Sequence, residues 1–364
     1  MRFEALTFLR FIAAAVVVLF HFGRAPLGLS GFLVAGPEMV TFFFVLSGFV
    51  MGVSTFNKNV DKTLYWWSRA ARILPVYWIA IAFMVATSRW RGEPVEYESL
   101  LLNLTLLQAW SPRHALTINA PGWSLSVEAF FYLTFPLLVL QIRKVSISPK
   151  ILMLSALMLW LITQVALTTV LELGDYKGWT SLSHGLVYYL PISHYCSFML
   201  GLAGSQIVLE RRRVLGSDFT SILAIGCASA LVLAITNNEA AISSYVNVQF
   251  AYGSSLLAPI FLLLIVAVAS ATPTVSRMLS SRPLVLLGEC SFSLYILQFP
   301  VYLLSTAFVA APLRLGPVSG FLSYFVLLIA VSLVSFVCFE RPVNTFLRGL
   351  FFYSFRSAKG RVAA

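Results

Sequence analysis

The sequence contains 364 residues, of which 59% are hydrophobic and only 11% are charged, with a formal net charge of +11. Soluble domains carry about a quarter charged residues, so this composition excludes an ordinary soluble protein. The excess of Lys and Arg does not indicate a nucleic-acid-binding protein either, because these residues flank apolar segments instead of gathering on one soluble domain. The composition therefore predicts a polytopic membrane protein built from α-helices.

Apolar residues form ten segments close to the length of about twenty residues that crosses a bilayer as a helix. The segments cover residues 5–22, 38–54, 73–88, 123–142, 151–170, 187–209, 219–236, 250–269, 284–307 and 318–340. A cytoplasmic N-terminus places eighteen Lys and Arg residues on the cytoplasmic side and six on the other, in line with the positive-inside rule. We therefore predict an all-α bundle of about ten spans with both termini cytoplasmic. It consists of a transmembrane domain, residues 1–345, and a basic cytoplasmic tail, residues 346–364.

Two short stretches and the cysteines refine this prediction. The first segment contains Arg10 and ends on a histidine instead of a small-residue cleavage pattern, so we interpret it as a span and not as a signal peptide. The stretch Leu100–Trp110 is too short to span, which predicts a position at the membrane interface. The four cysteines are far apart and lack metal-ligand spacing. We therefore predict packed thiols and no metal site.

Arg10 and His21 are the polar residues of the first segment. Eleven residues separate them, so an α-helix places both on one face, about 16 Å apart along its axis. An arginine inside the hydrocarbon layer costs a few kcal/mol or more unless it faces protein, water or a ligand. A lone histidine at a helix end often does no more than cap it, but the shared face favours a functional role for His21.

Two carboxylates occur on the same predicted side as His21. Glu128 lies about one turn inside the segment 123–142, where a carboxylate indicates a functional site, although structural pairing with Arg10 or Arg113 is the alternative. Glu38 stands at the start of the second segment, which the helix dipole explains. The sequence thus predicts a polar site where a histidine and one or two carboxylates converge.

The opposite, cytoplasmic side carries Arg69 and Arg72, which are three residues apart on one helical face. Such a pair can hold phosphate groups, or it can follow from the positive-inside rule alone. Ser47 and Gly48 lie within the second segment, where small side chains let a chain-like ligand approach the backbone. Close packing against another helix explains the same small residues.

Other polar residues carry weaker signals. Ser291, Ser293 and Gln298 make the ninth segment unusually polar, which indicates a cavity wall or a broken helix instead of a lipid-facing one. We interpret His114 and His184 as loop residues. His194 is interpreted as a buried polar partner between helices.

Six stretches of the chain together resemble the acyltransferase-3 family of integral membrane acyltransferases, and they do so in order along nearly its whole length. They are Leu9-Arg10-Phe11-Ile12-Ala13-Ala14 running to Phe20-His21, Phe42-Phe43-Phe44-Val45-Leu46-Ser47-Gly48-Phe49, Arg69-Ala70-Ala71-Arg72-Ile73-Leu74-Pro75, Trp123-Ser124-Leu125-Ser126-Val127-Glu128 with Phe131-Tyr132, Ser291-Phe292-Ser293-Leu294-Tyr295-Ile296, and Glu340-Arg341-Pro342.

The resemblance implies about ten transmembrane helices in the inner, cytoplasmic membrane and an O-acyltransferase activity. Its members usually move acetyl from acetyl-CoA to sugar hydroxyls of surface polysaccharides, lipopolysaccharide, peptidoglycan or lipid-linked glycans, and some modify macrolides or other small molecules. It therefore implies acyl-CoA, a glycan or lipid-linked sugar, and the lipid bilayer as partners, with no metal. Functional roles pass by resemblance to Arg10, His21, Arg69, Arg72 and Glu128.

The resemblance implies a mechanism that uses both sides of the membrane. Arg69 and Arg72 are expected to bind the CoA phosphates, while the pantetheine arm extends past Ser47 and Gly48 toward Arg10. His21 is expected to act as general base on the acceptor hydroxyl. Glu128 is expected to orient or charge-stabilise His21, and Arg10 to stabilise negative charge on the carbonyl oxygen. Direct transfer and a covalent acyl-enzyme both fit.

Two departures from the family pattern and one rival function accompany this prediction. Many relatives have a histidine where this chain has Gln298, and an acidic residue where it has Thr41. The rival is a secondary transporter in which Arg10, Glu128 and His21 form a proton or anion path. A matched pair of broken helices in two inverted halves would favour the transporter, and the sequence shows no such pairing.

Overall fold

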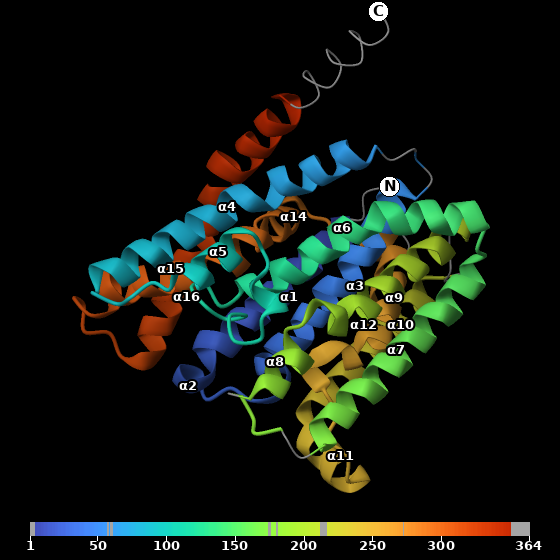
Figure 1. The fold of residues 1–364 in the computed structure, drawn as a ribbon, viewed down its shortest axis with the longest axis horizontal. Helices are drawn as coiled ribbons and strands as arrows, with labels where there is room; N and C mark the ends of the chain where they lie inside the picture. The colour runs from blue at the N-terminus through green and yellow to red at the C-terminus, as the bar shows by residue number, and fades with distance from the viewer. Residues whose placement is uncertain are drawn as a thin grey trace, which may run out of the picture.

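The computed structural model describes residues 4–350 except 57, 59, 60, 174, 175, 180, 212–216 and 272. All regular structure in this part of the chain is helical (Figure 1). Nine of its helices are long and apolar enough to cross a membrane: Glu4–Leu27, Gly36–Thr55, Lys62–Trp90, Gly122–Val145, Pro149–Glu172, Leu182–Glu210, Asp218–Asn237, Ser291–Ala310 and Pro317–Leu350. The predicted all-α, multi-pass bundle is therefore confirmed.

Several of these spans combine shorter helices. The elements in chain order are α1 (Glu4–Val18), the π-helical turn η1 (Leu19–Gly23), α2 (Arg24–Leu27), η2 (Gly31–Val34), α3 (Gly36–Thr55), α4 (Lys62–Trp90), α5 (Tyr97–Leu104), η3 (Gln108–Trp110), α6 (Gly122–Val145), α7 (Pro149–Glu172), α8 (Leu182–Tyr188), α9 (Pro191–Glu210), α10 (Asp218–Asn237), α11 (Glu239–Val246), η4 (Tyr252–Leu256), α12 (Ala258–Ala269), α13 (Pro273–Leu279), α14 (Arg282–Glu289), α15 (Ser291–Ser305), η5 (Thr306–Ala310), α16 (Pro317–Ser335) and η6 (Phe336–Glu340). The apolar stretch at Leu100–Trp110 forms only the short α5 and η3, as its length predicts.

The span predicted over 250–269 is broken. Only α12, with 12 residues, is regular helix, and η4 before it contains Ser255 at φ +66°. Its backbone groups find partners inside the bundle, because the Ser255 carbonyl accepts from Trp160 Nε1 at 3.0 Å and the Ser255 N–H donates to Thr41 Oγ1 at 3.2 Å. Irregular backbone at membrane depth is tolerated only when protein satisfies it in this way. The break thus lies in the eighth predicted span. The ninth predicted span, residues 284–307, is also interrupted, because α14 ends at Glu289 and α15 begins at Ser291.

Helices α3 and α9 form the centre of the bundle and are the most buried of its spans. Glycines allow their backbones to touch: a Cβ at Gly48 would collide with the carbonyl oxygen of Phe198, and a Cβ at Gly201 with that of Val45. At Gly48 the structure thus shows the close helix packing that the sequence offered as the alternative to a ligand-binding role. Polar groups on α3 are therefore held in fixed positions next to its other neighbours, α1, α6 and α12.

The outer helices frame this centre (Figure 1). Helices α7 and α10 lie at one edge, and the final helix, drawn in red, projects beyond the bundle. That helix is continuous from Pro317 to Leu350, so the domain boundary predicted after residue 345 falls inside it. Residues 351–364 of the predicted tail lie outside the described residues, and the boundary stays a prediction.

Candidate functional site

Two cavities enter the bundle, and both are lined by residues singled out in the sequence. The first, which we call the basic cavity, measures about 110 Å³. Its polar lining consists of Arg10 from α1, Ser47 from α3, Arg69 and Arg72 from α4, Ser124, Glu128 and Tyr132 from α6, and Ser291 and Tyr295 from α15. Five helices that are distant in sequence thus line one small space, and two of them, α1 and α4, bring three guanidinium groups to it.

The second cavity, which we call the aromatic cavity, measures about 640 Å³. Its aromatic lining comprises Phe20, Trp123, Trp179, Tyr188, Tyr189, Tyr252, Tyr295 and Phe299, and its titratable lining His21, Glu38, His184 and Glu239. This volume lies in the range of about 300–1,000 Å³ that small-molecule sites occupy. The basic cavity is far smaller, so the two suit ligands of different shape.

The two cavities meet at Val40 and Tyr295, which line both. Val40 lies on α3 and is 5% exposed. The Tyr295 hydroxyl contacts Ser124 Oγ at 2.9 Å and the Pro121 carbonyl at 3.2 Å, which fixes the ring between the two spaces. The two cavities are therefore neighbours, and these two side chains line both of them.

Aromatic rings hold Arg69 in the basic cavity. Arg69 lies over the rings of Tyr65 and Tyr132, at 5.2 and 5.7 Å from their centroids, and its buried Nε has no hydrogen-bond partner. Tyr65 is itself tied to α3 through Met51. A buried donor without an acceptor is unfavourable by about 1–3 kcal/mol, and an anionic ligand would relieve this.

Glu128 is the carboxylate of the basic cavity. Its Oε1 accepts a hydrogen bond from Ser47 at 3.0 Å, and its Oε2 accepts one from Tyr132 at 2.9 Å. Trp66 on α4 donates to the Tyr132 carbonyl at 3.1 Å, which fixes α4 against α6. These contacts hold Glu128 in the lining that also contains the arginines, and its charge acts on Arg10.

A second carboxylate, Glu340 at the end of η6, also acts electrostatically on Arg10 and Arg72. It is 7% exposed and accepts a hydrogen bond from Ser293 at 2.9 Å. In the described part of the chain no ion pair joins the three arginines to either carboxylate. Three guanidinium groups facing two carboxylates leave a positive excess around the basic cavity.

His21 has a defined tautomer. Gln298 Nε2 donates to the Tyr295 carbonyl at 2.7 Å, which turns Gln298 Oε1 toward His21 Nδ1 at 2.8 Å. Because an amide oxygen can only accept, Nδ1 carries the proton and Nε2 keeps its lone pair. Edge-on contacts with Phe20, Phe22 and Phe299 hold the ring. The basic nitrogen is therefore Nε2, on a residue that lines the aromatic cavity.

The helix widens where His21 occurs. Leu19–Gly23 form a π-helical turn between α1 and α2, and such turns are frequent at functional sites. Arg10 lines the basic cavity and His21 the aromatic cavity, although both lie on the same span. The expected common face is thus divided between two neighbouring cavities.

The structure changes two sequence-based interpretations of the site. Glu128 was expected to orient or charge-stabilise His21, but its oxygens bond to Ser47 and Tyr132, and the residue that bonds to His21 is Gln298. Ser47 lines the basic cavity, whereas Gly48 packs on α9. Gly48 therefore takes the helix-packing role that the sequence left as its alternative.

Several cavity residues gave little signal in the sequence. His184 was interpreted as a loop residue, but it lies in α8 and lines the aromatic cavity, with its Nδ1 at 3.0 Å from Tyr176 Oη. Glu239 begins α11 and lines the same cavity; burial raises the pKa of its carboxyl group to about 7. His194 is fully buried and contacts the Tyr188 carbonyl at 3.0 Å, as predicted for a polar partner between helices.

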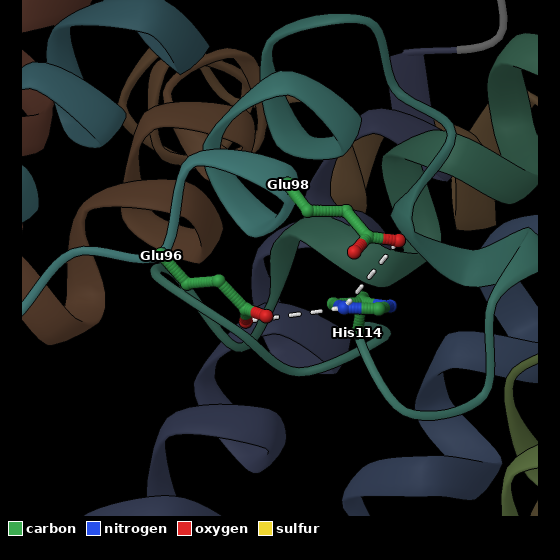
Figure 2. Close-up of side chains that lie close together, drawn as sticks. All are labelled: Glu96, Glu98 and His114. Atoms are coloured by element: carbon green, nitrogen blue, oxygen red, sulfur yellow. Dashed lines mark ion pairs between the residues drawn. The ribbon is translucent and has the colours of Figure 1, made fainter.

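A third group of polar side chains lies outside both cavities. Figure 2 shows Glu96 and Glu98 pointing toward His114 from a neighbouring segment. The His114 Nε2 is 3.9 Å from Glu96 and 4.0 Å from Glu98, while Ser111 Oγ contacts Nδ1 at 2.7 Å. Metal-binding residue types thus come together where the sequence predicted no metal site. Both carboxylates are largely exposed, at 63% and 68%.

Comparison with known proteins gives a consistent family. The acyltransferase domain model of the acyltransferase-3 family matches residues 3–339. The acyltransferase MdmB of Streptomyces mycarofaciens is 28% identical over 327 residues, which cover 82% of this chain and 79% of that protein.

Two further relatives match a smaller share of their own length. The exopolysaccharide production protein ExoZ of Rhizobium meliloti is 35% identical over 105 residues, 28% of this chain and 33% of the relative. The peptidoglycan O-acetyltransferase OatA of Listeria monocytogenes is 24% identical over 326 residues, 82% of this chain and 49% of the relative. No solved structure matches the chain.

Proposed function

The chain belongs to the acyltransferase-3 family of membrane O-acyltransferases, and we propose that it transfers acetyl from acetyl-CoA to a hydroxyl group of a cell-surface or lipid-linked glycan. One observation carries this proposal: a basic cavity and an aromatic cavity meet at Tyr295 and Val40 inside one bundle. Because this family consists of enzymes, the transporter alternative also loses its support.

The proposed orientation places the donor and the acceptor on opposite sides of the membrane. The distribution of Lys and Arg over the predicted loops favours a cytoplasmic N-terminus. The basic cavity then opens toward the cytoplasm, where acetyl-CoA is found, and the aromatic cavity faces the outside, where the acceptor glycan is exposed. We assign the protein to the inner, cytoplasmic membrane on this basis.

The donor would be held by Arg10, Arg69 and Arg72. The unpaired Arg69 Nε and the positive excess of the cavity fit an anionic ligand, and guanidinium groups match phosphate oxygens in pairs of hydrogen bonds. A space of about 110 Å³ admits a slender chain such as the pantetheine arm, which would pass Ser47. The surroundings of Arg10 favour donor binding over the carbonyl-stabilising role predicted from the sequence.

The chemical step would take place at the junction of the cavities. His21 Nε2 accepts the proton of the acceptor hydroxyl as the oxygen attacks the acetyl carbonyl. The new ester C–O bond forms, the thioester C–S bond breaks, and the proton passes to the CoA thiolate that leaves. Gln298 keeps His21 in the productive tautomer. Glu128 accepts a hydrogen bond from Ser47 and so fixes this side chain in the wall of the basic cavity, where the donor would bind.

The aromatic cavity supports a sugar-like acceptor. Trp123, Trp179 and Tyr189 offer flat apolar faces, while the carboxylates and histidines offer hydrogen-bond partners. The same volume also fits a glycosylated small molecule of the macrolide kind, which is the second candidate acceptor. We place the glycan first because one relative is named as a peptidoglycan O-acetyltransferase.

The direct test is transfer of radiolabelled acetyl across a sealed membrane. Vesicles that contain the protein receive labelled acetyl-CoA on the side of the basic cavity and a glycan acceptor on the other side, and the ester label on the glycan is measured. Arg10→Ala is expected to lose the label, whereas Arg24→Ala, an exposed arginine that lines neither cavity, is expected to retain it.

The outcomes separate the parts of the proposal. Label that appears only when acetyl-CoA is on the side of the basic cavity and the glycan is on the other side supports both the proposed orientation and the proposed donor. Equal labelling by empty vesicles, or label that requires acetyl-CoA on the side of His21, would overturn the proposal.

A further inference from the structure

The aromatic cavity has an acidic character that its proposed role does not explain. Two carboxylates line it, Glu38 at the start of α3 and Glu239 at the start of α11. Neither Lys nor Arg occurs among the described residues that line it. The other titratable side chains in its lining are two histidines and the tyrosines.

Glu38 is the more constrained of the two carboxylates. It is only 5% exposed, and its carboxylate bonds to its own backbone N–H, with no side-chain partner in the described part of the chain. The charge of Glu239 also acts on it, so two acidic groups repel each other across the cavity. A helix N-terminus favours each carboxylate, but this does not explain why both face a space without a counter-charge.

A bound cation is the simplest group that relieves this repulsion. A charged donor between two carboxylates forms the shorter and stronger class of hydrogen bond. A metal ion alone would leave the surrounding aromatic rings without a function, whereas a sugar ring covers them. Two requirements follow for the ligand: an apolar ring face for the tryptophans and a positive charge for the carboxylates.

We propose that the acceptor is a glycoside that carries a protonated amine, which Glu38 and Glu239 bind while His21 receives one of its hydroxyl groups. This proposal rests on the proposed O-acetyltransferase function and specifies its substrate class. Acceptors that carry a carboxylate or phosphate are disfavoured, because two acidic side chains already line the cavity.

The proposed binding mode also determines which atom is acetylated. An ammonium group held between carboxylates keeps its proton and has no free electron pair with which to attack the thioester. The hydroxyl group near His21 Nε2 loses its proton to that nitrogen and attacks instead. The expected product is an O-acetyl ester with a free amine.

The test uses three sugars that differ only at C6. Methyl 6-amino-6-deoxyglucoside, methyl glucoside and methyl glucuronide are cationic, neutral and anionic, and their binding to the purified full-length protein is measured by quenching of tryptophan fluorescence. Trp123 and Trp179 line the cavity and report on it. We expect the amino sugar to bind about 10-fold more tightly than the glucoside, and the glucuronide to bind most weakly.

Charge-neutral variants test which groups make this selection. Glu38→Gln and Glu239→Gln are each expected to bring the amino sugar and the glucoside to within about threefold of each other. Glu93→Gln, an exposed residue that lines neither cavity, is expected to keep the wild-type preference. If the buried Glu38→Gln variant fails to fold, Glu239→Gln alone decides the result.

Two results would overturn the inference: glucuronide binding as tight as amino-sugar binding, or an amino-sugar preference that both Gln variants retain. Binding is measured without acetyl-CoA, so the outcome does not depend on turnover. Selective amine binding without any acetyl transfer would contradict the proposed function and leave the acceptor class supported. Acetyl transfer without amine selection would support the proposed function and contradict the acceptor class.

Discussion

The basic cavity and the aromatic cavity lie in one bundle, but they differ in size and in the sign of their charge. The basic cavity gathers three arginines in about 110 Å³, whereas the aromatic cavity has two carboxylates and no Lys or Arg among its described lining residues in about 640 Å³. In the function proposed above, separate cavities of opposite charge would keep the anionic donor and the non-anionic acceptor apart. They can meet only where Tyr295 and Val40 line both spaces.

The two cavities also hold their central groups differently. In the basic cavity, Glu128 is fixed by hydroxyl groups of Ser47 and Tyr132, while Arg69 Nε has no partner. In the aromatic cavity, His21 is fixed by the amide of Gln298 and its second nitrogen stays available. The first arrangement suits binding of a charged ligand, and the second suits transfer of a proton.

The largest effect is expected from His21→Ala, which removes the proposed general base from the aromatic cavity and leaves the basic cavity unchanged. Loss of a general base lowers kcat by about 10²–10⁴-fold. Binding of acetyl-CoA, measured separately by equilibrium titration, is expected to stay within about twofold of wild type, because His21 does not line the basic cavity. Turnover that survives the substitution would return His21 to a structural role.

Arg69→Ala and Arg72→Ala are expected to affect the other cavity. Removal of one charged hydrogen-bond donor raises the KM for acetyl-CoA by about 10–100-fold and leaves the KM for the acceptor unchanged. Steady-state kinetics with each substrate varied in turn measures this split. Arg348→Ala, an exposed arginine that lines neither cavity, is the matched control. An increase confined to the acceptor KM would reverse the roles assigned to the two cavities.

Gln298→Ala is expected to lower kcat by about 10-fold, because the tautomer and orientation of His21 are then no longer fixed. Gln298→His, with a side chain that can still bond to His21 Nδ1, is expected to recover part of the loss. The pH profile of kcat/KM distinguishes this from a structural effect, since a positioning role shifts the limb that reports the base. A variant with reduced thermal stability but unchanged turnover and pH profile would contradict the assignment.

The smallest effect concerns pH. Burial raises the pKa of the Glu239 carboxyl group to about 7, so this group is neutral below that pH and ionised above it. The preference for an amino sugar over a neutral sugar is therefore expected to rise a few-fold between about pH 6 and pH 8.

Other titratable groups that line the same cavity as Glu239 contribute to this pH dependence: Glu38 on α3, His21 on η1, His184 and Tyr188 on α8, Tyr189, Tyr252 on η4, and Tyr295 on α15. Protonated histidines also weaken amine binding at low pH, so the comparison includes Glu239→Gln. A pH dependence that this variant retains in full would assign the effect to the histidines instead.

Hydropathy and a few intramembrane charges predicted most of the spans and several polar residues of the candidate site. The bilayer leaves helices as the only lipid-exposed spanning structures, and nine of the predicted spans appear as long apolar helices in the described part of the chain. The same rule identified Arg10 and Glu128 as site residues, because a charge in the hydrocarbon layer needs a partner or a ligand. It did not predict the break before α12, since the partners of Ser255 come from other helices.

What the sequence determined by itself is therefore the set of spans and the polar residues within them, because the solvent acts on each segment separately. Only the tertiary structure decided how those residues pair. His21 and Gln298 are 277 positions apart, and Ser47 and Glu128 are 81 apart, so no local pattern links them. Packing of α3 against α9 through Gly48 and Gly201, and of the surrounding helices against this centre, divides the polar residues between two cavities.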